Sequence, residues 1–251
     1  MCITKKSWPS SEGLKIGYLN INSARNKTDE IASILHNDGS GFHLFCFAES
    51  RLSQTILDSE IFMPGYDIVR LDTDPHNPKL TGLLVYCSKV LSFNRVSSFE
   101  SFDIESVWFE IKIKHNSPIL IGYVYRNPAE HIDWYDRFFS LLDAVFLENK
   151  ETIIMGDFNI DLLKSNSKWD RSYSMYNLEQ LIDCPTRVTA TSETLIDHIY
   201  VNTKQNIHEV CCPPSACSDH FPICLTWTKK KCKNSQNWTQ RNYLQIIYKI
   251  R

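Results

Sequence analysis

The sequence predicts an α/β (α+β) fold, a four-layer sandwich in which two packed, mainly antiparallel β-sheets are flanked by helices. Short apolar runs of strand length follow one another, with only a few helical segments between them. Such consecutive strands bury their apolar faces well when two sheets pack together. The composition, with 43% hydrophobic and 22% charged residues, is ordinary for a globular domain with a real core. The 251 residues contain no internal repeat or low-complexity segment and suit one large domain.

The first half of the chain is expected to consist mostly of strands. After the first strand, Ile31, Ile34 and Leu35 share one face of an amphipathic helix. The alternation that begins at Val107 predicts an antiparallel, half-exposed strand. Proline, asparagine and glycine separate the strands that we predict in this half, at 14–21, 43–49, 67–72, 81–88, 105–114 and 117–126.

The second half mixes helices and strands. Large apolar residues at helical spacing predict a helix over 134–146, and another helix is expected around 172–182. The run 151–159 predicts a strand that leads into a loop. Two more strands are expected, at 194–201 and 221–227.

Charge divides the chain into segments. We expect residues 1–13 to be an N-terminal extension, 14–228 to be the folded domain, and 229–251 to be a basic C-terminal tail or a truncated linker. The tail has seven basic and no acidic residues, which leaves 20 basic and 29 acidic residues, a net charge of −9, for the rest. Affinity for nucleic acid comes largely from neutralised phosphates. The body is therefore not a strong DNA-binding module by charge alone, and it suits an acidic pocket built around a cation. The basic run 229–233 is a nuclear address, a phosphate contact or a solvated linker.

Cysteine usage and hydropathy predict an intracellular protein. The nine cysteines are an odd number and include no C-x-x-C pair, so we expect free thiols in a reducing compartment. Cys46, Cys87 and Cys224 lie in apolar runs, where cysteine behaves as a small buried hydrophobe. The N-terminus lacks the apolar segment of a signal peptide, and no run reaches the roughly 18 apolar residues of a membrane span. We expect a monomer, and a nuclear location if the protein is active.

Polar side chains follow several of the apolar strands, at the point where each strand ends. With the two-residue period of a strand, Asn20 and Asn22 share one face, although asparagine at a strand end is usually a turn former. Glu49 directly follows an apolar run and is either a solvated sheet-edge carboxylate or a ligand for a hard cation. Asp157 and Asn159 follow Gly156 and read either as functional groups or as the capping residues of a turn.

The last two predicted strands carry the remaining candidates. Asp197 is flanked by aliphatic residues and would be costly to bury unpaired, so it needs a partner. His220 is the obvious partner, because a carboxylate fixes the imidazole tautomer and stabilises the imidazolium. His198 lies on the opposite face and is read as a surface or packing residue. A serine-hydrolase triad in the run from Ser218 to Asp219 and His220 is a poor alternative, since triad members come from separate elements.

Taken together these residues resemble the endonuclease/exonuclease/phosphatase superfamily over roughly residues 14–227. The motifs that carry the resemblance are Asn20, Glu49 in FAES, Tyr125 in VYRNP, Asp157 and Asn159 in GDFN, Asp197 in LIDHI, and SDH at 218–220. Within that superfamily VYRNP, IIMGDFNIDLL, the Pro-Thr-Arg at 185–187, TLIDHIYVN and SDHFPI are most similar to the endonuclease domain of non-LTR (LINE-type) retrotransposons.

The resemblance implies a metal-dependent endonuclease that nicks DNA and leaves a 3′-hydroxyl. A reverse transcriptase normally follows such a domain in the parent element; here the chain stops soon after the basic tail, which implies a truncated copy, an isolated exon or a cellular derivative. Two positions depart from the family: many relatives have glycine near Ser23 or Ala24, and repair enzymes have aspartate in place of Asn22. The second departure leaves Glu49 as the clearest metal carboxylate.

The roles that we assign as a hypothesis follow from this resemblance. Glu49, helped by Asn20 or Asn22 and supplemented by Asp219, binds Mg²⁺ (or Mn²⁺) at the scissile phosphate. Asp157 positions or deprotonates the attacking water, and Asn159 donates to the transition state. His220, polarised by Asp197, is a general base or a proton-bearing phosphate ligand, and Tyr125 donates a hydrogen bond to the phosphate. The alternatives are a phosphatase or phospholipid phosphodiesterase on the same scaffold, and an inactive retroelement relic that survives as a nucleic-acid-binding or interaction module.

Overall fold

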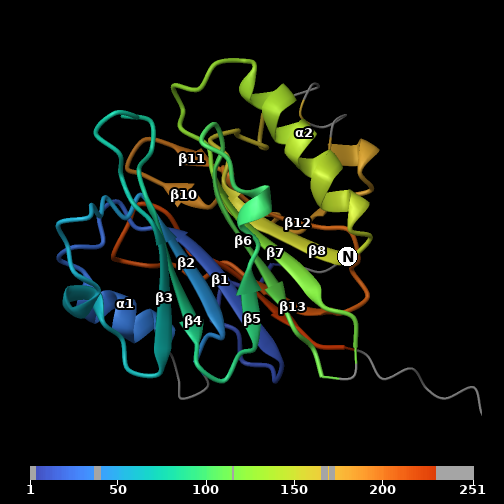
Figure 1. Cartoon of the computed structure of the whole chain (residues 1–251), viewed down its shortest axis with the longest axis horizontal. Coiled ribbons are helices and arrows are strands. Elements are labelled where there is room, and N and C mark those ends of the chain that lie inside the picture. The colour runs from blue at the N-terminus through green and yellow to red at the C-terminus, as the bar shows by residue number, and fades with distance from the viewer. Residues whose placement is uncertain (1–3, 37–40, 115, 165–168, 170–172, 230–251) are drawn as a thin grey trace, which may run out of the picture.

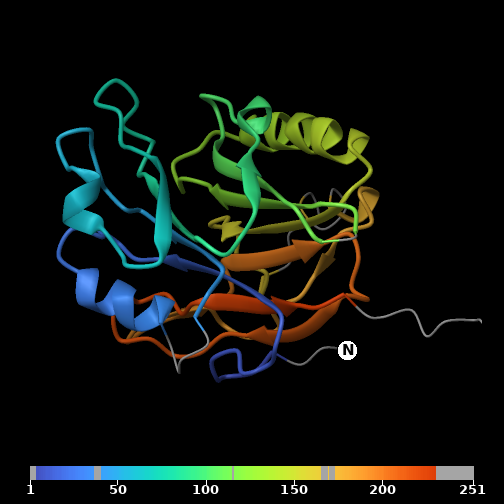
Figure 2. The same cartoon turned by 60° about the horizontal axis from the view of Figure 1, so that its bottom comes forward.

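The computed structural model describes residues 4–36, 41–114, 116–164, 169 and 173–229. Two six-stranded sheets pack face to face, and a helix covers the outer face of each (Figure 1). Helix α1 (Thr28–Leu35) lies on the first sheet and helix α2 (Trp134–Leu147) on the second. The turned view separates these layers clearly (Figure 2). The predicted four-layer sandwich is confirmed.

The first sheet has the order β13-β14-β1-β2-β4-β3. Its strands β1 and β2 are parallel, while its other neighbours are antiparallel. Parallel strands end at the same edge of a sheet, and Asn20 therefore lies opposite Ala48, next to Glu49. The strands are β1 (Leu14–Asn20), β2 (Leu44–Ala48), β3 (Tyr66–Leu71), β4 (Leu83–Ser88), β13 (Ile207–Cys211) and β14 (Ile223–Trp227).

The second sheet has the order β5-β6-β7-β8-β12-β9, with only β7 and β8 parallel. Its register places Asp157 between Tyr125 on one neighbouring strand and Asp197 on the other. The strands are β5 (Phe93–Arg95), β6 (Glu105–Ile111), β7 (Ile119–Tyr125), β8 (Glu151–Asp157), β9 (Glu179–Gln180) and β12 (Asp197–Val201). A separate hairpin, β10 (Arg187–Val188) with β11 (Glu193–Thr194), and two short 3₁₀ helices, η2 (Asp58–Ile61) and η3 (Ser97–Phe99), complete the described elements.

Three apolar clusters hold the layers together. Alternate residues of the two sheets, such as Tyr18 and Tyr123, meet in the central core, where their rings stack at 6.3 Å. On the outer faces, Ile31 of α1 packs in the same cluster as Phe45, and Trp134 of α2 in the same cluster as Trp108. Each such large side chain contributes roughly 1.5–3 kcal/mol by leaving water. The polar strand ends are thus carried on a rigid double-sheet frame.

Two predictions about elements are wrong. The strand at 105–114 was expected to be half-exposed, but β6 is buried on both sides, because Val107 faces the central core while Trp108 packs among the residues beneath α2. The helix expected around 172–182 is not formed over its second part: 173–175 are helical, but β9 pairs with the edge of β12 at Tyr200 and Val201. Pairing with a strand edge outweighed the local helical spacing there.

Segments outside the predicted domain also have contacts. In the N-terminal extension, the Lys5 amide donates to the carbonyl of Val210, and the amides of Ser10 and Ser11 donate to the buried carboxylate of Glu209. The extension therefore lies along β13. The basic tail after Lys229 lies outside the described residues.

The cysteines of the described residues agree with the prediction of free thiols. The seven cysteines in the described ranges are all free thiols, and Cys46, Cys87 and Cys224 are buried. Among the described helices, none is long and apolar enough to cross a membrane.

Candidate active site

The polar strand ends from the two sheets meet at one edge of the sandwich. Glu49 is the first centre of this cluster: its Oε1 accepts a hydrogen bond from Asn20 Nδ2 at 2.7 Å and another from the Tyr125 hydroxyl at 3.0 Å. Its Oε2 lies 3.2 Å from the guanidinium of Arg51, and 18% of its side chain stays exposed. Glu49 is thus held by both sheets and still open to solvent. Asn20 Nδ2 also donates to Asp157 Oδ2 at 3.0 Å and so joins Glu49 to the second centre.

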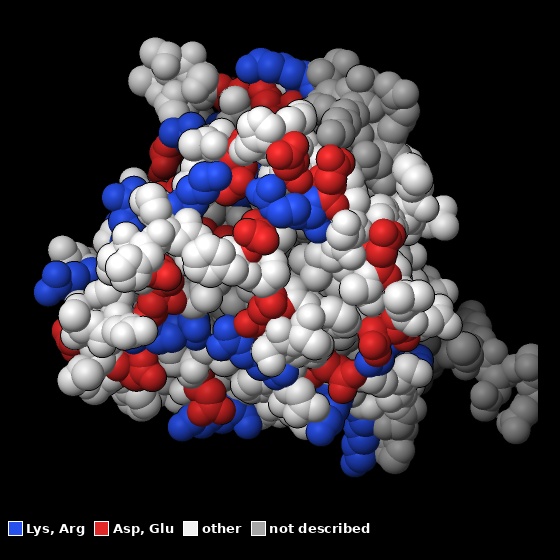
Figure 3. All heavy atoms as spheres, turned by 45° about the horizontal axis from the view of Figure 1, so that its top comes forward, with Lys and Arg blue, Asp and Glu red and all other residues white. Residues whose placement is uncertain are grey.

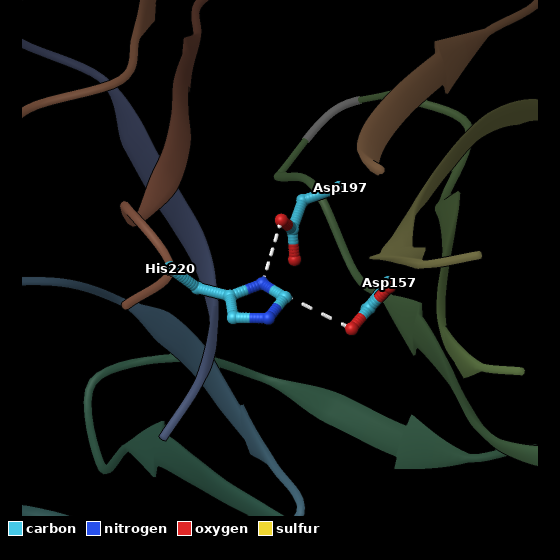
Figure 4. A group of neighbouring side chains, drawn as sticks. All are labelled: Asp157, Asp197 and His220. Atoms are coloured by element: carbon cyan, nitrogen blue, oxygen red, sulfur yellow. Dashed lines mark hydrogen bonds and ion pairs between the residues drawn. The ribbon is translucent and has the colours of Figure 1, made fainter. Parts of the chain in front are cut away.

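The second centre consists of Asp157, Asp197 and His220 (Figure 4). The two aspartates face each other across β8 and β12, while His220 reaches them from the segment before β14 in the other sheet. His220 Nδ1 lies 2.9 Å from Asp197 Oδ2 and 3.9 Å from Asp157 Oδ2. The sequence predicted that a buried Asp197 needs a partner. That partner is His220, which lies 23 residues further along the chain.

Burial and charge together shift the pKa values of this trio. Burial, and then the charge of Asp197, raise the pKa of Asp157 to about 7, although His220, Asn20 and the amide of Asn159 oppose the shift. Burial lowers the pKa of His220, but the charge and hydrogen bond of Asp197 outweigh it, with help from Asp157, and the pKa rises to about 9. Near neutral pH the imidazole is therefore protonated, while the Asp157 carboxyl is close to its titration midpoint. One oxygen of Asp197, Oδ1, is buried without a hydrogen bond to any described residue.

The backbone around Glu49 is in an unusual conformation. Glu49 has φ +48°, in the left-handed region that costs most residues about 1–2 kcal/mol. Ser23 has φ +80°; the family resemblance leads one to expect glycine, which adopts this region freely, near Ser23 or Ala24. The amide of Ser23 donates to the carbonyl of Glu49 at 2.7 Å, so that the two strained residues hold one another. Strain of this kind is typical of functional sites whose surroundings over-determine the conformation.

Asn159 and Asn22 reach the cluster through their backbones. The amide of Asn159 donates to Asp157 Oδ1 at 2.9 Å, and its side chain donates to the carbonyl of Arg126. Asn22 was expected to share a face with Asn20, but it lies beyond the strand with φ +48° and is exposed. Its amide donates to Asn20 Oδ1, and no described contact joins its side chain to Glu49. The period-two expectation for Asn22 is wrong, because the strand ends at Asn20.

Asp219 is engaged elsewhere. Its Oδ2 accepts a hydrogen bond from Arg187 Nε at 2.8 Å, which lowers its pKa against the opposing effect of burial. No described contact links Asp219 to Glu49. His198 is a packing residue, fully buried, with Nε2 near the carbonyls of Ile160 and Leu195.

Sequence reasoning missed several residues that hold the site together. Thr186 is fully buried, and its hydroxyl accepts the amides of Ile196 and Asp197, which fixes the start of β12. Ser218, the rejected serine of a triad, donates to the carbonyl of Asn20 at 2.7 Å and accepts the amide of His220. Both belong to the quoted motifs, but nothing in a single sequence says that their hydroxyls are used for backbone support.

The surface around the cluster has mixed charge. Acidic and basic side chains both border a hollow near the middle of the face in Figure 3. A pocket of about 280 Å³ opens beside Tyr125 and Glu105, with Lys79, Asn127 and Phe102 among its lining residues. Acidic and basic side chains are interspersed on this face, although the chain before residue 229 has an excess of acidic residues.

A pH-dependent stability follows from the raised pKa of His220. An imidazole whose pKa rises from 6.5 to about 9 on folding stabilises the fold fully below pH 6.5, and this stabilisation is lost as the pH rises through 9. In metal-free buffer, the free energy of unfolding should therefore fall by about 2 kcal/mol between pH 7 and 8.5, at about 1.4 kcal/mol for each pH unit. Urea unfolding at the two pH values measures the fall.

The matched variants for this measurement are His220→Asn and His208→Asn. His208 lies exposed on β13, so its variant should keep the full dependence, whereas His220→Asn should lose most of it. All three chains carry Asp157→Asn as well, because the loss of His220 would by itself raise the pKa of Asp157. The remaining groups, including buried thiols, then affect the three chains alike. Equal falls in the His220→Asn variant and the parent would contradict the assignment.

Comparison with known proteins supports a family assignment. The family model described as Endonuclease/Exonuclease/phosphatase family matches residues 17–220. The endonuclease domain of TRAS1, a telomere-specific non-LTR retrotransposon, is similar with a TM-score of 0.66 and 12% identity, covering 87% of this chain and 100% of that one. An AP endonuclease from Leishmania major is similar with a TM-score of 0.70 and 13% identity, covering 91% of this chain and 93% of that one.

Other matches are as distant in sequence. The catalytic domain of APE2 from Xenopus laevis has a TM-score of 0.60 and 14% identity, covering 87% of this chain and 95% of that one. No curated protein sequence matches this chain. At these identities the solved structures show a shared fold alone, while the family model covers most of the chain and includes the segments that carry Glu49, Asp157, Asp197 and His220. The chain belongs to the endonuclease/exonuclease/phosphatase family.

Proposed function

We propose that this chain is a Mg²⁺-dependent phosphodiesterase of the retrotransposon endonuclease type, which nicks DNA and leaves a 3′-hydroxyl. One observation supports the proposal above all. The partly exposed carboxylate of Glu49 lies at the same edge of the sandwich as the buried trio of Asp157, Asp197 and His220. The asparagine Asn20 hydrogen-bonds to both centres. Such an arrangement can hold a hard cation on one side of a phosphate and move protons on the other.

Glu49 is the best candidate for the metal carboxylate. Mg²⁺ is usually held by one or two carboxylates, waters and substrate phosphate, rather than by an all-protein cage. Glu49 fits that requirement, because its carboxylate is partly exposed and its orientation is set by Asn20 and Tyr125. Bound there, Mg²⁺ (or Mn²⁺) would supply a Lewis acid for the charge on the phosphoryl oxygens and the leaving group.

The other proposed metal residues fit less directly. Asn20 orients Glu49 through its amide nitrogen, Asn22 is exposed beside it, and Asp219 would first have to release Arg187. The ligand atoms of Asp157, Asp197 and His220 lie within 4.8 Å of one another and could also hold a metal. We assign this trio to proton transfer instead, because its internal bonds already use Asp197 Oδ2 and His220 Nδ1.

The shifted pKa values favour Asp157 as the proton acceptor and His220 as the proton donor. Asp157, with a pKa near 7, is suited to position the attacking water and accept its proton, since a general base works best near the operating pH. His220, with a pKa near 9, is protonated at neutral pH and is suited to donate from Nε2 to a phosphate oxygen while Nδ1 donates to Asp197. Asn159 lies beside these groups as a further donor, and the Tyr125 hydroxyl could donate to the phosphate if it released Glu49.

DNA as the substrate is supported by the motifs that resemble LINE-type elements and by a structural neighbour that is a retrotransposon endonuclease domain. We propose that the basic tail, residues 229–251, adds phosphate contacts. A reverse transcriptase in a longer parent element would use the 3′-hydroxyl as a primer.

A plasmid-nicking assay tests the proposal. With Mg²⁺ the chain should convert supercoiled plasmid to open circles, EDTA should stop the reaction, and a polymerase should extend the nicks directly. The same preparation is offered an inositol phosphate and sphingomyelin. Turnover of either, without nicking, would identify a phosphatase or phospholipid phosphodiesterase. No turnover of any substrate by a folded chain would favour the inactive relic.

A further inference from the structure

Glu105 is a buried carboxylate at the sheet interface, one strand away from the site. It begins β6, lies opposite Tyr125 in the register with β7, and is only 6% exposed. Its oxygens accept hydrogen bonds from the amide of Gly82 at 2.7 Å, from the amide of Thr81 at 3.0 and 3.2 Å, and from the Thr81 hydroxyl at 3.2 Å. All three donors come from the segment that leads into β4 of the other sheet. Glu105 therefore ties the two sheets together beside the site.

The same two residues hold the segment after Glu49 from their other side. The carbonyl of Gly82 accepts the amide of Ser50 at 3.0 Å, and the carbonyl of Thr81 accepts the amide of Arg51 at 2.9 Å. Residues 81–82 therefore lie between Glu105 and the turn at 49–51. The backbone of Gly82 also lies close to the Ser50 side chain, since a Cβ on Gly82 would lie 2.5 Å from Ser50 Oγ.

The turn at 49–51, which residues 81–82 hold, has a strained backbone. Glu49 has φ +48° and Arg51 has φ +53°, in the left-handed region that is unfavourable for residues other than glycine, so the turn would relax if it were not held. A relaxed turn would carry the Glu49 carboxylate away from Asn20 and Tyr125. The contacts from residues 81–82 oppose that movement, and Glu105 in turn fixes residues 81–82.

We infer that Glu105 is a positioning residue for Glu49, acting through the Thr81 and Gly82 peptide groups to hold the carboxylate in the geometry that binds a divalent cation. The inference rests on the proposed metal-binding role of Glu49. Glu105 itself touches neither the cation nor the substrate. It differs from a merely structural carboxylate in that its loss should reduce cation affinity in a folded protein.

The test measures Mn²⁺ binding directly, by the electron paramagnetic resonance of free Mn²⁺, in the parent chain and in Glu105→Gln. The glutamine keeps the volume, but its carbonyl replaces only one carboxylate oxygen, and its NH₂ group then faces the amide of Thr81, where it cannot accept. We expect the Mn²⁺ dissociation constant to rise about 10- to 100-fold, the usual effect of removing an outer-shell partner. The nicking rate at low Mg²⁺ should fall in parallel and be partly restored by excess Mg²⁺. Glu110→Gln is the matched control, because Glu110 is on the same strand and only pairs with Lys150.

A second pair of variants decides the matter if Glu105→Gln does not fold. Gly82 and Gly65 both have positive φ, +92° and +86°, but an added Cβ meets Ser50 Oγ at 2.5 Å only at Gly82 and nothing within 4 Å at Gly65. Gly82→Ala should therefore weaken Mn²⁺ binding, while Gly65→Ala should lower stability alone.

The outcomes separate the inference from the function on which it rests. A folded Glu105→Gln that binds Mn²⁺ as the parent does would overturn the positioning role, even if its melting temperature were lower. If Glu105→Gln does not fold, equal Mn²⁺ affinities in Gly82→Ala and Gly65→Ala would overturn it. A parent chain that binds no Mn²⁺ would instead refute the metal assignment at Glu49, and the positioning role with it.

Discussion

Replacing His220 by alanine is expected to reduce the rate of DNA nicking by about 10²- to 10⁴-fold, the usual cost of losing a general acid or base. The effect should fall on kcat rather than on KM, because the imidazolium contributes most where charge develops on the phosphate in the transition state. A single-turnover nicking assay at saturating Mg²⁺ measures it.

The contacts of His220 explain why no neighbour can replace it. Its Nδ1 is bound to Asp197, so that Nε2 is the nitrogen left for the proposed contact with the substrate. Removing the ring leaves the carboxylates of Asp197 and Asp157 buried, both 1% exposed, without their shared cation. Their mutual repulsion should then raise the pKa of Asp157 further and move the pH optimum of any residual activity upward.

Two variants make this prediction specific. His208→Ala, on the exposed side of β13, should nick at the parental rate. Asp197→Asn keeps a hydrogen-bonding group beside Nδ1 but removes the charge that raises the pKa of His220, and it should lower activity most at alkaline pH. If His220→Ala nicked plasmid at the parental rate, the role assigned to the trio would be wrong.

The features that the sequence predicted well are those set by local pattern or by an unavoidable cost. The strand from Leu14 and the helix that carries Ile31, Ile34 and Leu35 follow from periodicity alone, and both are present. The pairing of Asp197 with His220 followed from the cost of burying a carboxylate without a partner. The joining of Asn20 to Glu49 was not predicted in detail, but both were placed at strand ends of one site.

The secondary-structure predictions are wrong or missing where contacts between residues distant in sequence determine the structure. Leu178, Leu181 and Ile182 have helical spacing, yet the edge of β12 takes this segment as a strand. The strand β13 was not predicted because it contains Glu209, a carboxylate that is 1% exposed. Glu209 can be buried only because Lys5 and the amides of Ser10 and Ser11 reach it from about 200 residues away.

The same reason explains the errors within the site. A two-residue period holds only inside a strand. The strand β1 ends at Asn20, and Asn22, two residues later, has a left-handed backbone conformation. The ion pair of Asp219 with Arg187, 32 residues away at 2.8 Å, was not predicted, and the role of Asp219 beside the metal stays a prediction. Glu105 escaped notice because it begins a strand, where a charged residue is unremarkable until the segment from the other sheet is seen against it.

Replacing Glu49 by alanine should have the second large effect, a loss of nicking of about 10³-fold that added Mg²⁺ does not restore. The several kcal/mol that a Lewis acid contributes to a phosphoryl transition state correspond to a factor of this size. Mn²⁺ binding should be lost in the same variant, whereas Glu30→Ala on the exposed face of α1 should keep both properties. Parental Mn²⁺ affinity in Glu49→Ala would remove Glu49 from the metal site.

The conformation of Glu49 adds a second, independent expectation. At φ +48° a glycine is relaxed and alanine is as strained as glutamate, so Glu49→Gly should be more stable than Glu49→Ala by about 1 kcal/mol in urea unfolding. At an ordinary loop position the order would be reversed, because glycine loses more entropy on folding. An inactive Glu49→Gly that is also more stable than Glu49→Ala would mean that the left-handed turn is maintained for its carboxylate, at a cost to the fold. Equal stabilities would show that the surrounding contacts from Ser23 and residues 81–82, rather than strain at Glu49, determine the energetics of this turn.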